Sequence, residues 1–471
     1  MTKRIAGLLC GVMCFWLGLP QSQATARPNV LMICIDDMND WVGCLRGNPE
    51  VKTPNIDALA ARGRNFSNAH CVVPVCSPSR VSVMSGVHAV THGSYELGPS
   101  YQSIPRLDDV SCLQEYFKAH GYRTFAGGKV LHHGFTGRLK DAIDVSLGER
   151  KGGPRPKQQM NWKGAWDWGA FPETDADMYD YQLAQNAARA LREKHEQPFF
   201  MSVGLFRPHV PMFVPPKWYD MYDADKLTLP LAPPEDMDDI PPNFQHIDQI
   251  APTPAEVKEA GKWRELVRAY YASVSFADMC VGTVMAGLDA GPNKDNTIVV
   301  LWSDHGFHLG EKQHLAKRTL WEESTRVPFM IAGPGIKPGA DCREAVSLLD
   351  VYPTLVELCG LPVNPHNEGL SVLPQLRNPA AQRERPALTS SYFGNHAVRT
   401  RDWRYIRYAD GAEELYDHRN DPMEFTNLAL SASHHEAIAD LRRWLPKNVA
   451  PEVMAAAAKR MGKAGKKRKQ R

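Results

Sequence analysis

The segment "NVLMICIDD", Asn29 to Asp37, is an apolar run that ends in two aspartates. A continuous apolar run of this length predicts a strand that is buried on both faces of a sheet. Three later segments have the same design, an apolar run followed by polar groups: "YRTFAGGK" (Tyr122 to Lys129), "FFMSVGLFRPH" (Phe199 to His209) and "TIVVLWSDHG" (Thr297 to Gly306). The repetition predicts four strands of one buried sheet.

Helical patterns separate these runs, at Thr53 to Gly63, Ser111 to Gly121, Asp175 to His195 and Trp263 to Gly291. Alternation of strands and helices predicts the α/β class. In such sheets ligands bind at the carboxyl ends of the strands. Since all four runs carry their polar groups at that end, we expect these groups to meet at one site.

The residue pattern changes after Arg377. Short runs there alternate aromatic and charged residues around an Asp410-Gly411 turn. This pattern predicts an antiparallel hairpin sheet, covered by a helix from about His434 to Trp444. We therefore divide the chain into a signal peptide (1–26), a catalytic domain (27–385), a smaller C-terminal subdomain (386–448) and a basic tail (449–471). The segments 135–175 and 214–255 are expected to be long loops over the site.

The chain has 471 residues, 43% of them hydrophobic, which is enough for a large core. A net charge of +2 argues against a general nucleic-acid binder. Lys459 to Arg471 nevertheless holds eight Lys/Arg and no acidic residue. This tail is expected to be a disordered, solvated extension, or else a weak anchor to an acidic polysaccharide or a membrane surface.

The N-terminus has the three parts of a signal peptide. Lys3 and Arg4 precede the apolar stretch Ile5 to Leu19, and Ala24-Thr25-Ala26 offers a cleavage site. We expect export to the periplasm or the medium, a mature chain starting near Arg27, and no stable membrane span; a retained anchor is the alternative. The eight cysteines beyond this segment are scattered without zinc spacing, and export would allow some of them to form disulfides.

Two polar pairs follow apolar runs, Asp36-Asp37 and Asp304-His305. Adjacent carboxylates beside a buried sheet need a compensating cation. Three carboxylates with few soft ligands favour a hard divalent ion such as Ca²⁺.

Cationic side chains follow the other runs: Lys129, then His132 and His133, then His209, and Lys317 further along the chain. Taken singly, such a lysine is commonly a surface residue, and such a histidine commonly binds no ligand. Gathered around a metal held by carboxylates, they indicate an oxyanion substrate with several negative charges.

Cys76 lies in "VVPVCSPSRVSVMSG", where Pro78 suits the first turn of a helix and Gly86 suits its end. Cys76 is therefore expected at a helix N-terminus, where the dipole favours an anion, with Arg80 one turn later. From the residues alone, a buried structural cysteine and a thiolate nucleophile beside histidine both stay open.

"CSPSR" resembles the Cys/Ser-x-Pro-x-Arg signature of the type I, formylglycine-dependent sulfatases. Later blocks are similar to that family in the same order: "GKVLHHG", "RPHVPMFVP", "SDHGFHLGEKQHLAK" and "LLDVYPTLVELCGL". "GKVLHHG", "RPHVP" and "SDHG" look most like the iduronate-2-sulfatase branch. The resemblance implies an alkaline-phosphatase-like fold, a large mixed sheet between helices with a smaller C-terminal antiparallel-sheet subdomain.

The resemblance implies that a maturation enzyme oxidises Cys76 to formylglycine, whose hydrate would attack sulfur and hold the sulfate covalently. The second hydroxyl of the hydrate would then expel sulfate. Asp36, Asp37, Asp304 and His305 would bind one Ca²⁺ beside the modified residue, which is itself a ligand. His305 stands where many members of the family have asparagine.

The resemblance also implies five further roles. Arg80 would steady the hydrate and the metal-site carboxylates, and Lys129 and Lys317 would bind sulfate oxygens. His132 would assist the diol, although its neighbour His133 leaves that assignment open. His209 would protonate the leaving oxygen or donate a hydrogen bond to it.

These inferences predict a sulfatase that acts on a sulfated carbohydrate of glycosaminoglycan or algal type. A phosphodiesterase or phosphonate monoester hydrolase with the same nucleophile is one alternative, and a non-catalytic sulfoglycan-binding protein is another. Trp162, Trp166, Trp168 and Trp218 in the expected loops would suit stacking on sugars, or would simply pack in the loops.

Overall fold

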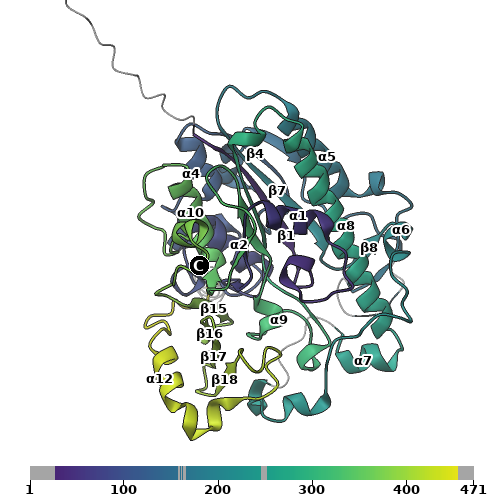
Figure 1. Cartoon of the computed structure of the whole chain (residues 1–471), viewed down its shortest axis with the longest axis vertical. Coiled ribbons are helices and arrows are strands. Elements are labelled where there is room, and N and C mark those ends of the chain that lie inside the picture. The colour runs from purple at the N-terminus through teal and green to yellow at the C-terminus, as the bar shows by residue number, and fades with distance from the viewer. Residues whose placement is uncertain (1–26, 158–159, 161, 163–165, 245–251, 454–471) are drawn as a thin grey trace, which may run out of the picture.

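An eight-stranded sheet forms the centre of the molecule (Figure 1). The computed structural model describes residues 27–157, 160, 162, 166–244 and 252–453. The strands lie in the order β13 (Ala340–Cys342), β2 (Arg64–Phe66), β12 (Phe329–Ala332), β9 (Thr297–Ser303), β1 (Asn29–Asp36), β7 (Phe199–Pro208), β4 (Arg123–Gly128), β5 (Val145–Gly148).

The four expected strands are neighbours in this sheet. β1 is central and parallel to both β7 and β9, and β4 is parallel to β7. Their carboxyl ends therefore share one edge of the sheet. β12 runs antiparallel to β9 and β2, which makes the sheet mixed, as the resemblance implied.

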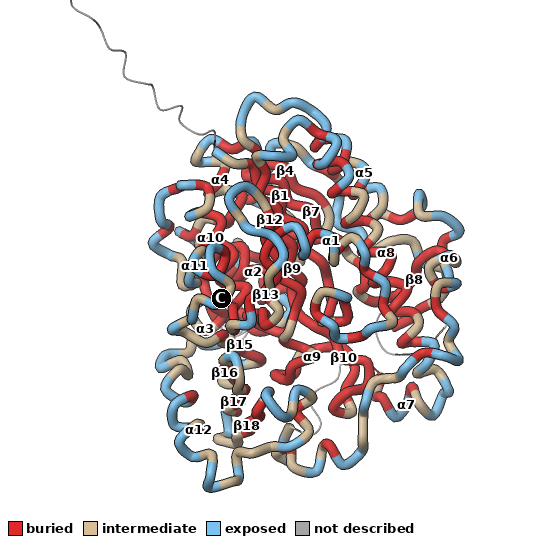
Figure 2. Tube along the Cα trace, viewed as in Figure 1, coloured by how far each residue is buried: buried red, intermediate tan, exposed pale blue. Residues whose placement is uncertain are grey.

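Helices cover both faces, and the side chains of β1 alternate between two apolar cores. Leu31, Ile33 and Ile35 face one core, whereas Val30, Met32 and Cys34 face the other. The first core includes α1 (Pro54–Arg62), α5 (Tyr179–Arg192) and α8 (Trp263–Asp289), and the second includes α2 (Cys76–Ser85), α4 (Leu113–Ala119) and α10 (Val351–Leu358). Figure 2 shows the strands buried between these layers, which explains why their sequences are apolar throughout.

Short elements complete this part of the molecule. They are α3 (Ala89–His92), α6 (Pro216–Tyr219), α7 (Pro254–Glu259), α9 (Glu322–Thr325), α11 (Leu373–Arg377) and the strand pairs β3 (Ala69–His70) with β14 (Val346–Ser347), β6 (Trp168–Ala170) with β8 (Met212–Val214), and β10 (His308–Leu309) with β11 (Leu315–Ala316).

Among the described residues one helix, α8, is long and apolar enough to cross a bilayer. The most apolar 18-residue window of α8 is 78% buried inside the molecule. Packing in the core accounts for that apolarity.

The C-terminal sheet has four antiparallel strands: β15 (Ala387–Ser391), β16 (Asn395–Arg399), β17 (Trp403–Arg407) and β18 (Glu413–Asp417). α12 (His435–Arg442) covers one face, where Ile438 and Leu441 pack on Tyr405. The predicted fold class, including this smaller sheet, is confirmed. The division after residue 385 stays a prediction, and the predicted signal peptide and most of the basic tail lie outside the described residues.

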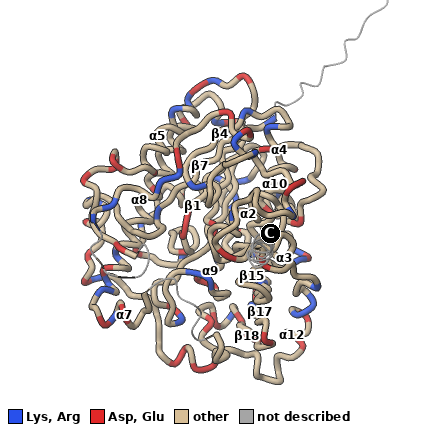
Figure 3. Tube along the Cα trace, turned by 180° about the vertical axis from the view of Figure 1, so that it is seen from behind, with Lys and Arg blue, Asp and Glu red and all other residues tan. Residues whose placement is uncertain are grey.

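Of the four tryptophans in the expected loop segments, two are buried and two are partly buried. Trp166 and Trp168 are only 3% exposed and belong to the apolar core, and Trp162 and Trp218 pack against it. Within the described chain all eight cysteines are free thiols. Figure 3 shows basic and acidic segments intermingled over the molecule.

A buried ion-pair network joins the two sheets. Arg404 on β17 is fully buried and pairs with Glu322 on α9 and with Glu424. Its guanidinium also donates to the Leu320 carbonyl (2.9 Å) and to the Thr325 hydroxyl (3.0 Å). The C-terminal sheet is therefore fixed to α9 by an arginine and two glutamates that are at most 10% exposed.

Replacing Arg404 by alanine should destabilise the protein by about 3 kcal/mol, because the buried Glu322 and Glu424 would lose their shared cation and keep Arg399 and His418 beside them. Chemical denaturation measures the loss. Arg443→Ala is the matched control, since that arginine is 66% exposed and its one ion pair within the described residues is with the 67% exposed Asp440. Equal stability of the two variants would contradict the structural role of Arg404.

Candidate active site

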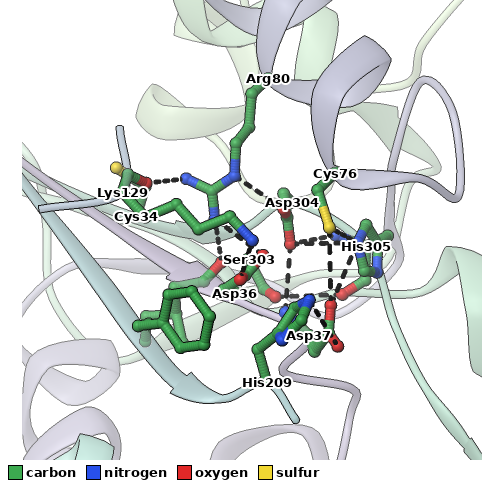
Figure 4. A network of polar contacts seen from close by, with 12 residues as sticks. Cys34, Asp36, Asp37, Cys76, Arg80, Lys129, His209, Ser303, Asp304 and His305 are labelled. Carbon is green, nitrogen blue, oxygen red and sulfur yellow. Dashed lines mark hydrogen bonds and ion pairs between the residues drawn. The ribbon is translucent and has the colours of Figure 1, made fainter. Parts of the chain in front are cut away.

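The site lies where the carboxyl ends of β1 and β9 meet (Figure 4). β1 ends at Asp36, and Asp37 turns the chain with a φ of 62°. The Asp37 amide donates to a carboxylate oxygen of Asp304, 3.2 Å away, just beyond β9. The two strand ends thereby bring three carboxylates into one buried cluster.

Cys76 is the first residue of α2, and its side chain lies at the helix N-terminus. The Sγ atom is 3.1 Å from Lys317 Nζ and 3.2 Å from His305 Nε2. Burial opposes ionisation of the thiol, but the surrounding cations, led by Lys129 and Lys317, hold the pKa of Cys76 well below its usual range. The position favours an anionic nucleophile.

Arg80 lies one turn further along α2 and is completely buried. Its Nε donates to Asp304 (2.7 Å), and Nη2 donates to Asp36 (3.3 Å) and to the Ile35 carbonyl (3.2 Å). Its Nη1 donates to the main-chain oxygen of Lys129. One guanidinium thus links α2 to the ends of three strands.

The charged groups of the cluster shift one another's pKa values. Burial raises the pKa of Asp304 to about 6, although the positive charge of Arg80 acts to lower it. Burial alone would lower the pKa of His305, yet the adjacent Asp304 carboxylate raises it to about 9. Burial also opposes ionisation of Asp36, but Lys129 is among the cations that hold the pKa of Asp36 below its usual range.

The cluster offers ligands for a metal ion. Ligand atoms of Asp36, Cys76, Asp304 and His305 lie within 4.8 Å of one another, and so do those of Asp36, Asp37, Cys76 and His209. The second carboxylate oxygen of Asp37 is buried and accepts no hydrogen bond from any described residue. His305 Nδ1 donates to the Gly306 carbonyl at 2.9 Å, so Nε2 is the ring nitrogen that faces the cluster and would give up its proton to bind a metal.

Two lysines flank the carboxylates. Lys129 follows β4, and its Nζ pairs with Asp36; Lys317 Nζ pairs with Asp37 at 2.5 Å. The Lys129 amide donates to the Gly204 carbonyl of β7 at 2.7 Å. A Cβ atom at Gly204 would lie 2.2 Å from the Lys129 carbonyl carbon, so only glycine permits this approach.

Two further predicted histidines lie beside the cluster. His132 is close enough to Cys76 to help lower the pKa of its thiol, whereas the exposed His133 lies by Gly98. The geometry therefore places His132 at the sulfur. His209 Nε2 is 3.9 Å from Asp37, and its side chain is 19% exposed, which leaves it accessible to a ligand.

Three residues that the sequence did not single out also hold the site. Ser79, within "CSPSR", donates to the Asp304 carbonyl (2.6 Å), and Tyr270 on α8 donates to the Asp37 carbonyl (2.8 Å). Arg207 donates to the His209 carbonyl (3.2 Å). Adjacency to known motifs could have indicated Ser79 and Arg207, but no local signal indicates Tyr270.

Family models match most of the chain. The model described as "Sulfatase" matches residues 28–361, and "N-sulphoglucosamine sulphohydrolase, C-terminal" matches residues 310–450. A "Sulfatase" of Formosa agariphila is 38% identical, over 89% of this chain and 87% of its own length. The iduronate 2-sulfatase of Mus musculus is 30% identical, over 76% and 74% of the two chains.

Solved structures share the fold. The phosphonate monoester hydrolase of Agrobacterium radiobacter superposes with a TM-score of 0.73 at 20% identity, covering 89% of this chain and 95% of its own. The expected alkaline-phosphatase-like architecture is thus confirmed. The match of the sulfatase model to residues 28–361, together with the 38% identical relative, shows that this chain belongs to the sulfatase family.

Proposed function

We propose that this sulfatase hydrolyses sulfate esters of a carbohydrate, with residue 76 as formylglycine and one Ca²⁺ at the carboxylate cluster. The observation that carries the proposal is the placement of the Cys76 side chain at a helix N-terminus, between Lys317 Nζ (3.1 Å) and His305 Nε2 (3.2 Å). Such surroundings stabilise negative charge on both a nucleophile and a bound oxyanion.

Oxidation by a formylglycine-generating enzyme and hydration would give residue 76 two hydroxyl groups, one for attack on sulfur and one for the later release of sulfate. His132 lies beside this side chain and would take up the proton of the attacking hydroxyl. Arg80 holds the helix and the carboxylates in place for that attack.

Asp36, Asp37, Asp304 and His305 would hold the metal, with residue 76 as a further ligand. Bound there, Ca²⁺ would supply positive charge that polarises a sulfate oxygen and favours the deprotonated nucleophile. Its preference for oxygen ligands agrees with three carboxylates, one of which keeps a buried oxygen without a hydrogen bond.

Lys129 and Lys317 would move from their aspartate partners to the oxygens of the sulfate group. Both are almost completely buried, so their charges are poorly screened and strongly attract an anion. His209, the more accessible group, would donate a proton to the leaving oxygen of the alcohol.

A carbohydrate substrate of glycosaminoglycan or algal type is supported by the relatives. The mouse relative is named iduronate 2-sulfatase, and this chain carries the motifs "GKVLHHG", "RPHVP" and "SDHG" that look like that branch. We propose specificity of that kind, a sulfate on a ring that also carries acidic groups. Export of the enzyme through the segment 1–26 is part of the same proposal.

The structural likeness to a phosphonate monoester hydrolase favours a second candidate reaction. A metal-assisted nucleophile between two lysines could attack phosphorus as well as sulfur. The mature enzyme should cleave an aryl sulfate with a higher kcat/KM than an aryl phosphonate or a phosphodiester. The reverse preference would overturn the sulfatase proposal in favour of the second candidate.

The tryptic peptide 65–80 tests the modification. In protein from the native host, residue 76 should show a mass loss of about 18 Da relative to cysteine. Cys71 in the same peptide is an internal control. If residue 76 is formylglycine, alkylation should modify Cys71 alone, so the peptide should gain one alkyl group instead of two. Two alkylated cysteines in active, host-derived protein would contradict the formylglycine proposal, and two in inactive protein would favour the non-catalytic alternative.

Metal binding should raise the thermal stability independently of activity. Adding Ca²⁺ to chelator-treated protein should raise Tm by several degrees, because the ion binds only the folded carboxylate cluster. Asp37→Asn should abolish that rise. Asp440→Asn, a change at an exposed carboxylate, should leave it intact. An equal Tm with Ca²⁺ and with chelator would contradict the proposed site.

His209→Gln should lower kcat/KM on a sulfated sugar by a factor of about 100 or more, because a sugar alkoxide needs a proton to leave. The same change should cost less than about tenfold on an aryl sulfate, whose phenolate leaves without help. His133→Gln is the matched control and should change neither rate. Equal losses on both substrates would contradict the role of His209.

A further inference from the structure

The turn between β15 and β16, residues 392–394, extends from the C-terminal sheet toward Cys76. The hydroxyl of Thr389 donates to the Cys71 carbonyl (2.6 Å), and the Ser390 amide donates to the Val72 carbonyl (2.9 Å). β15 thus runs alongside the segment 71–75 that leads directly into Cys76. The turn at its end lies level with the start of α2.

Arg318 connects this turn to the catalytic lysine pair. Its amide donates to the Pro74 carbonyl (3.1 Å), its own carbonyl accepts from Ser391 Oγ (2.5 Å), and its Nη1 donates to the Tyr392 hydroxyl (3.2 Å). The residue before it is Lys317, whose Nζ is 3.1 Å from Cys76 Sγ. Arg318 therefore connects the turn to Lys317, and through it to Cys76.

The segment 95–99 forms the adjoining wall. The rings of Tyr95 and Phe393 meet edge to face at 6.1 Å, and Glu96 pairs with Arg318 at 2.7 Å. At its other end the Pro99 carbonyl accepts from Ser77 Oγ (3.4 Å), directly after Cys76. Together, residues 95–99, Arg318, Tyr392 and Phe393 form one connected rim, which meets the chain at Pro74 and Ser77, on either side of Cys76.

This rim exposes an aromatic ring on a rigid support. Phe393 is 52% exposed, one of six large apolar side chains exposed among the described residues. Tyr392 has a φ of 53° and Arg318 a φ of 89°, a conformation that bulky residues adopt only when their surroundings impose it. Such backbone outliers gather at sites that bind ligands.

We propose that Phe393 is a specificity-determining contact whose ring stacks on the apolar face of the sugar that bears the scissile sulfate or adjoins it. The inference rests on the proposed function. Sugar rings present C–H groups that pack on aromatic faces, whereas Trp166 and Trp168 of the expected loops are inside the core. The C-terminal sheet thus contributes to substrate recognition.

The test compares three variants of the mature enzyme: Phe393→Ala, Phe393→Tyr and, as a matched control, Leu430→Ala, which alters an 89% exposed apolar side chain of the C-terminal subdomain. KM for a sulfated oligosaccharide and Ki for inorganic sulfate, which touches only the sulfate site, are measured for each. Phe393→Ala should raise KM about five- to tenfold. Ki should not change, and Phe393→Tyr should retain the wild-type KM.

An unchanged KM in Phe393→Ala would overturn the assignment, and so would an equal rise in Ki, which would show that the variant disturbs the sulfate site itself. Leu430→Ala raising KM as much would likewise overturn it. If the wild-type enzyme cleaves no sulfated sugar, the proposed function fails together with the assignment. If the wild type cleaves one and Phe393→Ala keeps the wild-type KM, only the assignment fails.

Discussion

The buried guanidinium of Arg80 is the contact on which the site depends. It donates to Asp304 beyond β9, to Asp36 at the end of β1 and to the main chain of Lys129 after β4, while its own backbone belongs to the helix that begins at Cys76. Without this guanidinium, and without Lys129 and Lys317 beside it, the three carboxylates of this buried cluster would repel one another. With this cation among them, the strand ends and the nucleophile keep one fixed geometry.

The same geometry explains why the two sheets contribute different parts of the site. The parallel strands of the large sheet bring the carboxylates and lysines to one edge, because their carboxyl ends coincide. The small sheet is fixed to α9 through Arg404 and its two glutamates. Its first strand follows the segment that leads into Cys76, so the β15–β16 turn reaches the rim of the site. A binding surface made from both sheets needs that rigid junction.

The four central strands and the meeting of their polar residues could be predicted from the sequence. The apolar runs indicate which strands are buried, and residues that follow parallel neighbouring strands lie at the same edge of the sheet. The position of Arg80 one turn from Cys76 follows from helical spacing. Contacts between segments distant in the chain could not be predicted: Tyr270 approaches Asp37 from the middle of α8, and Phe393 approaches Tyr95 from another sheet. The choice between His132 and His133 likewise needed the course of the loop after Lys129.

In the proposed reaction the group at position 76 attacks sulfur directly. A Cys76→Ser variant tests it, since a serine hydroxyl can take the sulfuryl group from the substrate but has no second hydroxyl to expel it. After incubation with a sulfated substrate, the tryptic peptide 65–80 of this variant should gain about 80 Da at residue 76, and a Cys76→Ala peptide should gain nothing. An unmodified Cys76→Ser peptide, from a variant that still releases sulfate, would contradict direct attack by residue 76.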